Sequence, residues 1–278
     1  MKKKNIVVGL TYDLASTYKI KPGDPKDKYS EFDTKKIISG ISRALLAHGC
    51  RTMLIGNFSS LLSHLPNIKK TVDIVFNTAE GLEGRNREAQ VPFLLEYAGI
   101  PYVGSDALTM SLTLDKVFTK KVLIAEHIPT PRFMVTDRKV RSVDLSFPLI
   151  VKPRWEGSSK GITAQAKVSS IQALNERISH VVGLYRQPAL VEEFIPGREC
   201  TIAIMGNGTK LRVLPPLEIY IRGKSVGEKI FHGRYVYSND VDYMRVAGIS
   251  SSLKSNIIDL AKRTYRAVDC KDFGRIDF

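Results

Sequence analysis

Lys152 and the glycine- and serine-rich segment after it, Gly157–Gly161, carry the clearest chemistry in the chain. The hydrophobic run Phe147–Val151 leads directly into this lysine. A buried strand would hold the ammonium group in one place, and a glycine/serine loop offers backbone N–H groups and hydroxyls at close approach. This combination suits a polyphosphate ligand. An ordinary hairpin turn has the same composition, so it stays open as the alternative.

The glycine/serine segment is not a Walker A loop. It lacks the Gly-Lys-Ser/Thr ending, and the residues after it alternate like a strand instead of beginning a helix. The pattern predicts an antiparallel pair of strands, Phe147–Lys152 and Ile162–Ala166, with the loop between them.

The composition indicates a folded protein of two or three subdomains. The chain has 278 residues with a formal net charge of +14, which favours an anionic partner. Nucleic acid is one candidate, and nucleotide phosphates fit as well. The basic residues are scattered, which favours a solvated basic surface over a nucleic-acid footprint. The three cysteines have no CxxC spacing, and no apolar run reaches membrane-spanning length. We expect a cytoplasmic protein without membrane partners.

The first hundred residues predict an open parallel sheet covered by helices. Short apolar strands are expected at Asn5–Leu10, Thr52–Ile55 and Val72–Phe76, with a helix from Thr34 that ends at Gly49. Ligands bind at the carboxyl ends of strands in such sheets. The charged loop after the third strand leaves at that edge, so we expect it to contact substrate.

The second half predicts two further units of mixed strands and helices. Asp115 is placed to cap a helix whose first residue is Lys116, and Ile128–Pro131 is a linker. A lysine in the first turn opposes the helix dipole, which hints at a role beyond the surface. Further on, a hairpin turns near Gly206–Gly208 and a last helix spans about Leu253–Val268.

A strand that ends at Glu192 and Glu193 carries a second pattern. Its exit can present backbone groups to an adenine edge while Ile195 packs on the ring, and Glu199 can reach a ribose hydroxyl pair. Taken alone, this pattern also fits an edge strand with solubilising charges.

The order of these motifs resembles the D-alanine–D-alanine ligase group of ATP-grasp enzymes. The shared elements are Phe76–Asn77, "GIPYVGSDALT…LDK", "IPTPRF", Lys152 before "EGSSKG", "EEFIPGRE" and "GRIDF". The resemblance spans nearly the whole chain. It implies an α/β protein with the ATP-grasp fold: an N-terminal parallel-sheet (pre-ATP-grasp) domain and two α+β subdomains enclosing ATP. The domains expected are 1–105, 106–187 and 188–278.

The resemblance also implies roles for individual residues. Lys116 and Lys152 would contact the ATP phosphates, and Ser158 and Ser159 would close over them, Ser158 also serving catalysis. Adenine would be lined by Glu192, Glu193 and Ile195, and the ribose bound by Glu199. Arg275 would stabilise the oxygen of the reacting acyl carbon, and Asp277 would bind Mg²⁺ or Mn²⁺. The implied reaction joins a carboxylate to an amine through an acyl phosphate, as in dipeptide or cell-wall precursor synthesis.

The sequence departs from the family around the amino-acid pocket. Glu80 stands where a histidine is usual, and Arg85 stands where an acidic residue is usual. The glutamate that holds the first substrate's ammonium has no clear match, and Glu31 and Asp33 lie near its place. The family's Lys-Tyr pair aligns with Arg234–Tyr235 or with Val236–Tyr237. Ligation therefore survives the comparison better than D-alanine specificity, and the substrates are predicted only as small and amino-acid-like.

The family also continues past its "GRxD" strand into a strand with Glu and Asn metal ligands, which this sequence does not include. A truncated ligase and a shortened, catalytically impaired nucleotide-binding paralogue are both consistent with this. A ligase for other amino acids and a nucleic-acid-binding protein are further alternatives. The resemblance suggests a homodimer.

Overall fold

The computed structural model describes residues 6–227 and 240–278, so the two candidate Lys-Tyr positions, Arg234–Tyr235 and Val236–Tyr237, lie outside it. The chain forms two compact units. One comprises residues 1–20 and 29–114, and the other comprises residues 21–28 and 115–278. The division into three domains at 105 and 187 stays a prediction. In the described part of the chain, no helix has the length and apolar character needed to cross a membrane.

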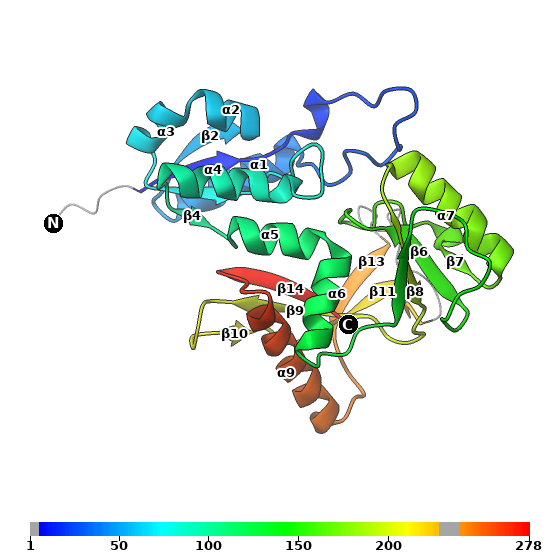
Figure 1. Ribbon diagram of the computed structural model, residues 1–278. Coiled ribbons are helices and arrows are strands. Elements are labelled where there is room, and N and C mark those ends of the chain that lie inside the picture. Colours follow the sequence, from blue (N-terminus) through cyan, green and yellow to red (C-terminus); the bar gives the residue numbers. More distant parts are fainter. Residues whose placement is uncertain (1–5, 228–239) are drawn as a thin grey trace. The chain divides into compact units, whose positions relative to one another are not determined.

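A four-stranded parallel sheet forms the centre of the first unit, with the strand order β2-β1-β3-β4 (Figure 1). Its strands are β1 (Val7–Thr11), β2 (Arg51–Gly56), β3 (Ile74–Asn77) and β4 (Tyr102–Val103). Its helices are α1 (Lys35–Ala47), α2 (Phe58–Ser63), α3 (Leu65–Thr71), α4 (Gln90–Ala98) and α5 (Ala107–Leu114). The predicted parallel sheet is confirmed.

Alternation along the strands sends side chains to two separate cores. Val8 and Leu10 of β1 pack with Ile38 of α1 on one face. Val75 of β3 packs on the other face with α2, α3 and α4. The helix expected from Thr34 begins as predicted, because the Thr34 hydroxyl accepts a hydrogen bond from the Ile37 N–H and so caps α1.

An antiparallel sheet with the order β5-β8-β6-β7 forms the first part of the second unit. Its strands are β5 (Phe133–Thr136), β6 (Leu149–Pro153), β7 (Lys167–Val168) and β8 (Ala189–Glu193), and its helices are α6 (Lys116–Ala125) and α7 (Ile171–Tyr185). Helix α7 packs its apolar side on this sheet (Figure 1).

The strand predicted at Ile162–Ala166 is wrong. Residues Ala164–Ala166 form a 3-10 helix, and the partner of β6 is the shorter β7. The register places Leu149 opposite Val168 and Ile150 opposite Lys167, so the connection from β6 runs from 154 to 166. The loop is therefore longer than a hairpin turn.

A six-stranded antiparallel sheet forms the rest of the second unit. Its strands are β9 (Cys200–Met205), β10 (Arg212–Val213), β11 (Leu217–Ile221), β12 (Lys224–Ser225), β13 (Val241–Arg245) and β14 (Phe273–Asp277). Helix α9 (Ser251–Ala267) packs Ala261 and Tyr265 against Ile202 and Ile204 of β9. The predicted hairpin after β9 and the predicted last helix are both confirmed.

Candidate active site

The cap of helix α6 fixes the position of Lys116. The buried Asp115 carboxylate accepts hydrogen bonds from the first turn of α6, from both ends of the Arg154 guanidinium at 2.7 Å and from the Trp155 indole at 3.1 Å. Burial alone would raise the pKa of Asp115, but the bonds from Arg154 and the helix backbone lower it overall. The Lys116 ammonium in turn contacts the carbonyl oxygen of Glu156.

Lys152 is held by a buried carboxylate on the neighbouring strand. Glu192 of β8 lies opposite Ile150 of β6, so Lys152, two residues further along, projects from the same face of the sheet. Oε2 of Glu192 is 2.5 Å from the Lys152 ammonium, and Oε1 is 2.7 Å from the ammonium of Lys120 on α6. We name these three residues the lysine–glutamate network.

The network carries a net positive charge in a largely buried place. Glu192 is 6 % exposed and Lys120 is 5 % exposed. Burial alone would raise the pKa of Glu192, but the two ammonium groups lower it overall. Burial lowers the pKa of Lys120, and Glu192 offsets part of that shift. Two cations that share one carboxylate leave an excess charge of one unit, which favours an anionic ligand beside Lys152.

The glycine/serine loop begins directly beside Lys116 and contains both predicted serines. Ser158 has φ 43° and Ser159 has φ 59°, so two successive non-glycine residues are left-handed. The Glu156 side chain, at the start of the loop, contacts the Lys160 ammonium and accepts a bond from Gln187 at 2.8 Å. Ser158 is exposed, so its hydroxyl is accessible to a ligand.

The end of β8 and the residues after it include the three side chains predicted to lie near the base and the ribose. Glu193 accepts hydrogen bonds from Arg132 and from the Ser146 N–H. Ile195 is 65 % exposed, which suits a side chain that awaits a flat apolar partner. Glu199 directly precedes β9 and is half-buried. Their predicted roles toward adenine and ribose stay predictions.

Arg275 and Asp277 lie on one face of β14, at positions two residues apart. The Arg275 Nε is 3.3 Å from Oδ1 of Asp277, and both side chains are largely exposed. The Thr201 hydroxyl donates a 2.6 Å hydrogen bond to the same Asp277 oxygen. Asp277 pairs with Thr201 across the ladder, so β9 orients this carboxylate.

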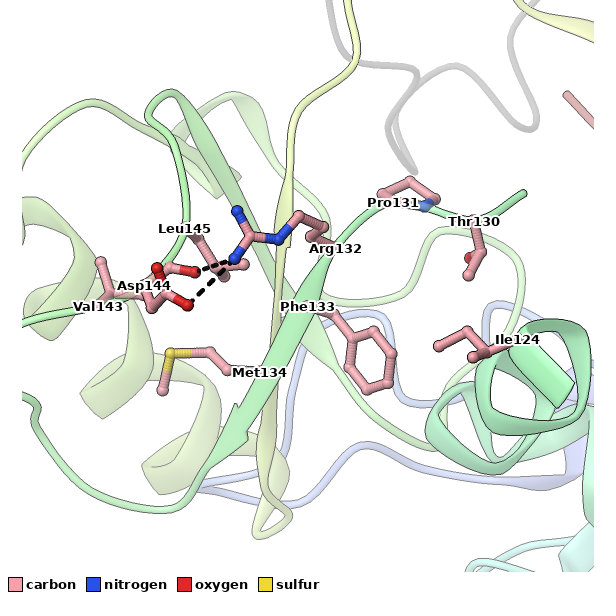
Figure 2. Close-up of a pocket in the computed structure, with 9 residues that line it drawn as sticks. All are labelled: Ile124, Thr130, Pro131, Arg132, Phe133, Met134, Val143, Asp144 and Leu145. Carbon is pink, nitrogen blue, oxygen red and sulfur yellow. Dashed lines mark hydrogen bonds and ion pairs between the residues drawn. The ribbon is translucent and has the colours of Figure 1, made fainter. Parts of the chain in front are cut away.

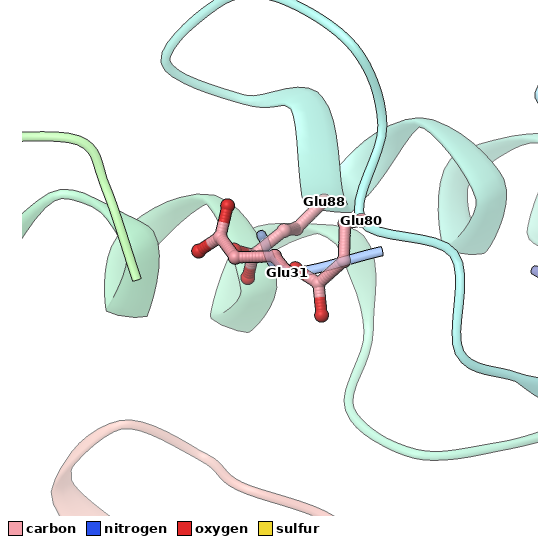
Figure 3. Close-up of side chains that lie close together, drawn as sticks. All are labelled: Glu31, Glu80 and Glu88. Carbon is pink, nitrogen blue, oxygen red and sulfur yellow. The ribbon is translucent and has the colours of Figure 1, made fainter. Parts of the chain in front are cut away.

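In the first unit, three carboxylates lie close together (Figure 3), and one of them, Glu80, follows the carboxyl end of β3. Carboxylate oxygens of Glu31, Glu80 and Glu88 lie within 4.8 Å of one another. The buried guanidinium of Arg87 is 2.8 Å from Glu31 and 3.5 Å from each of Glu80 and Glu88. We call these four residues the acidic cluster; a cation supplied by the chain already lies among its carboxylates.

One member of the acidic cluster has a strongly shifted pKa. Burial, followed by the nearby carboxylates of Glu88 and Glu31, raises the pKa of Glu80 to about 8. This shift favours the protonated form of Glu80. Its loop is fixed by the buried Asp13, whose carboxylate accepts the N–H groups of Glu80 and Gly81 at 3.1 and 2.9 Å.

Of the three predicted substrate-binding residues, the structure brings Glu31 and Glu80 together but not Arg85, and their role toward substrate stays a prediction. Arg85 is exposed, whereas Arg87 is buried among the carboxylates. Lys120 was missed entirely, although it lies four residues after Lys116 and so one turn further along α6. That spacing is the signal that could have found it.

A cavity of about 480 Å³ lies along the edge strand β5 (Figure 2). Phe133, Met134 and Ile124 contribute apolar walls, and Arg132 bonds to Asp144 at its rim at 3.1 Å. No residue predicted to bind nucleotide is among its lining residues. Two of its lining residues nevertheless contact the Lys120 ammonium: the Thr130 hydroxyl at 2.7 Å and the Phe133 ring, whose centroid is 5.0 Å away. The cavity therefore borders the lysine–glutamate network.

The two antiparallel sheets, with lysines beside a glycine/serine loop and an Arg-x-Asp strand, define an ATP-grasp protein, and the comparisons with known proteins agree. The family described as "D-ala D-ala ligase C-terminus" matches residues 126–278. A D-alanine–D-alanine ligase from Bordetella petrii is 35 % identical over 243 residues, which is 86 % of this chain and 71 % of the relative. An uncharacterised protein, y4sG, from Sinorhizobium fredii is 34 % identical over 249 residues, 87 % of this chain and 73 % of the relative.

A solved structure shares the fold at lower identity. The D-alanine–D-alanine ligase from Bacillus anthracis complexed with ATP matches with a TM-score of 0.69 and 20 % identity, over 98 % of this chain and 81 % of that chain. The chain belongs to the D-alanine–D-alanine ligase family. It is an ATP-dependent ligase with the ATP-grasp fold, as the motifs predicted.

Replacing Lys120 by methionine tests the lysine–glutamate network. The change keeps the apolar stem but leaves Glu192 buried with one cation, so we expect a loss of about 3 kcal/mol in the free energy of unfolding. Lys121→Met, at the exposed next position on α6, should lose less than about 1 kcal/mol. Urea denaturation measures both. Equal, small losses would show that the network does not hold the site.

Replacing Glu80 by glutamine tests the protonated state of the acidic cluster. A folded pKa near 8, raised from 4.5, means that the folded protein binds more protons across that interval. The stability contributed by Glu80 is thus complete below pH 4.5 and is lost as the pH rises through 8, by up to about 1.4 kcal/mol per pH unit.

Glu80→Gln should remove this decline, whereas Glu83→Gln, on the exposed part of the same loop, should retain it. Unfolding free energies measured between pH 5 and pH 9 distinguish the two variants. A wild-type protein whose stability does not fall relative to Glu80→Gln over this interval contradicts the raised pKa.

Proposed function

We propose that this ligase joins the carboxylate of one amino acid to the amine of another, with ATP as the energy source and an acyl phosphate as intermediate. D-alanine is the substrate that the named relatives suggest. The observation that carries the proposal is the lysine–glutamate network beside the glycine/serine loop. It supplies a fixed positive charge next to hydroxyl and N–H donors, which is what a triphosphate requires.

In this proposal the second unit binds the nucleotide. Lys116 and Lys152 contact the phosphates, and Ser158 and Ser159 donate to the terminal phosphate from the loop. Ile195, with its exposed side chain, covers the adenine ring. Glu192 would line the adenine pocket only with its backbone on β8, because both of its carboxylate oxygens are engaged by lysines. The sites of Glu193 at the base and Glu199 at the ribose follow from the family resemblance.

The chemistry proceeds in two displacements. A carboxylate oxygen of the first substrate attacks the γ-phosphorus, the bond to the ADP oxygen breaks, and an acyl phosphate forms. The free amine of the second substrate then attacks the acyl carbon, and the resulting tetrahedral intermediate loses phosphate as the amide forms and the amine gives up a proton. Arg275 stabilises the negative oxygen of that intermediate. The protein contributes positioning and charge, so no side-chain nucleophile is needed.

Asp277 fits a magnesium ion that is held mainly by phosphate and water. Its Oδ1 accepts from Thr201 and faces Arg275, while the side chain is largely exposed and retains coordination capacity. Mg²⁺ commonly binds through one or two carboxylates and substrate phosphates, which matches a single acidic residue here. When bound, the ion would neutralise charge on the transferred phosphoryl group; Mn²⁺ has the same ligand preference.

The acidic cluster is our proposal for the amino-acid site. An ammonium group next to Glu31 and Glu88 would be stabilised by their charges, and protonated Glu80 could donate to a substrate carboxylate. A small amino acid carries both groups. The family's usual histidine is replaced by Glu80, so amino acids other than D-alanine are included in the proposal.

Phosphate release from ATP and Mg²⁺, measured with a panel of D- and L-amino acids, tests the function. We expect release that depends on a specific amino acid or pair, with a dipeptide detected by mass spectrometry. Lys152→Ala should raise the KM for ATP at least about tenfold, because a charged hydrogen bond to phosphate is lost. Lys139→Ala removes an exposed lysine of the same unit and should leave KM unchanged.

ATP binding weakened by Lys152→Ala but without turnover on any amino acid would instead identify a nucleotide-binding module. Salt-dependent binding to DNA or RNA without ATP binding would identify the nucleic-acid alternative.

Arg275→Ala tests the second displacement. Because the guanidinium is proposed to act on charge that develops only in the intermediate, kcat should fall about a hundredfold while the KM for ATP changes little. Arg212→Ala, on exposed β10 of the same sheet, is the matched control. A larger effect on the KM for ATP than on kcat would assign Arg275 to nucleotide binding instead.

A further inference from the structure

The glycine/serine loop is fixed at both ends, and one of its anchors comes from far away in the sequence. At its start, the Glu156 carbonyl contacts Lys116. At its end, the Gly161 N–H donates a 2.8 Å hydrogen bond to Oδ2 of Asp27, a residue 134 positions earlier. The Gly161 carbonyl contacts the buried guanidinium of Arg177. Both backbone polar groups of Gly161 are therefore engaged.

Gly161 cannot be replaced without moving its surroundings. Its φ is +72°, and a Cβ atom there would lie 2.4 Å from Pro153 Cγ and 3.1 Å from the Tyr185 ring. The loop thus returns to the end of β6 through a position that only glycine can occupy. A hydrogen bond at this point restrains the backbone just after Ser158 and Ser159.

Asp27 is itself held by a second group. The Tyr185 hydroxyl, at the end of α7, donates to both Asp27 oxygens at 2.8 and 3.0 Å. Burial and the Asp27 charge raise the pKa of Tyr185, so this hydroxyl keeps its proton and acts as a donor. The carboxylate is thereby oriented toward the loop.

The segment that carries Asp27 lies apart from the buried core. Residues 21–28 belong to the second unit by their contacts, although the chain before and after them belongs to the first. None of its side chains is part of the buried core. Asp24 bonds within the segment, to the Lys21 N–H at 3.0 Å and to Lys28 at 3.1 Å, whereas Asp27 reaches the loop.

We propose that Asp27 is a positioning residue for the proposed phosphate-binding loop, supplied by the segment 21–28. It holds the Gly161 N–H so that the two serines are presented to the nucleotide. The inference rests on the proposed nucleotide role of this loop, and it adds a residue that the motif pattern does not contain.

Asp27→Ala tests the inference by two independent measurements. Hydrogen exchange of the nucleotide-free protein should become about tenfold faster in peptides that cover residues 157–162, because the Gly161 amide loses its acceptor. In the same variant the KM for ATP should rise about fivefold to tenfold, since the loop must be ordered when nucleotide binds. Asp24→Ala, in the same segment, should change neither quantity.

Two further variants separate positioning from a general structural role. Asp27→Asn keeps an oxygen that can accept from Gly161 and should restore most of the exchange protection and of the KM. Tyr185→Phe should reproduce a smaller part of both effects, and combining it with Asp27→Ala should add little. Faster exchange throughout the second unit would mean that Asp27 only stabilises the fold, and would overturn the proposal.

Unchanged exchange at 157–162 in Asp27→Ala overturns the proposed anchoring. Faster exchange there with an unchanged KM for ATP overturns the link to nucleotide binding. Failure of the wild-type protein to bind ATP would refute the proposed function, and the exchange measurement would still decide whether Asp27 anchors the loop.

Discussion

The chemistry of the second unit depends on one buried carboxylate, that of Glu192, shared between two lysines. A buried charge is costly unless it is paired, and a carboxylate with two ammonium partners has both of its oxygens satisfied. Among the described residues, no second carboxylate pairs with either lysine, so the three residues together carry one excess positive charge. This charge supports the proposed nucleotide site, and β8 and β6 hold it because their register places Glu192 and Lys152 on the same face.

A few elements of the fold position most of the residues that we propose bind the nucleotide. Helix α6 positions Lys116 next to its Asp115 cap and positions Lys120 one turn later. The sheet delivers Lys152 and Glu192, and the loop begins where β6 ends. Rigid elements therefore supply the charges, whereas the loop supplies the hydroxyl and N–H groups that we propose approach and release the nucleotide. Arg275 and Asp277 share one short strand for the same reason, since alternate residues project together.

Much of this arrangement could be predicted from the sequence because its signals are local. Strand periodicity, the caps at Thr34 and Asp115, and the motif around Lys152 are each readable within a few residues. The strand at 162–166 failed because its alternation mimicked pairing, while the register between β6 and β7 is a long-range property. The buried place of Arg87 could not be predicted, because it depends on the 3-10 helix at Arg87–Ala89 and on contacts with Glu31, which is far away in the sequence. The contact of Asp27 with Gly161 could not be predicted, because it joins residues 134 positions apart and no local sequence pattern marks it.

The excursion at 21–28 has a consequence for how such a chain can be divided. The second unit is assembled from two separate stretches, so no single cut of the backbone separates it from the first. A fragment that begins at Asp115 would leave the Gly161 amide without its acceptor. If recombination exchanged the amino-terminal domains of two related ligases, the new domain would therefore bring a foreign 21–28 segment with it. The segment 21–28 and the glycine/serine loop that it contacts would therefore have to mutate together, although they lie far apart in the sequence.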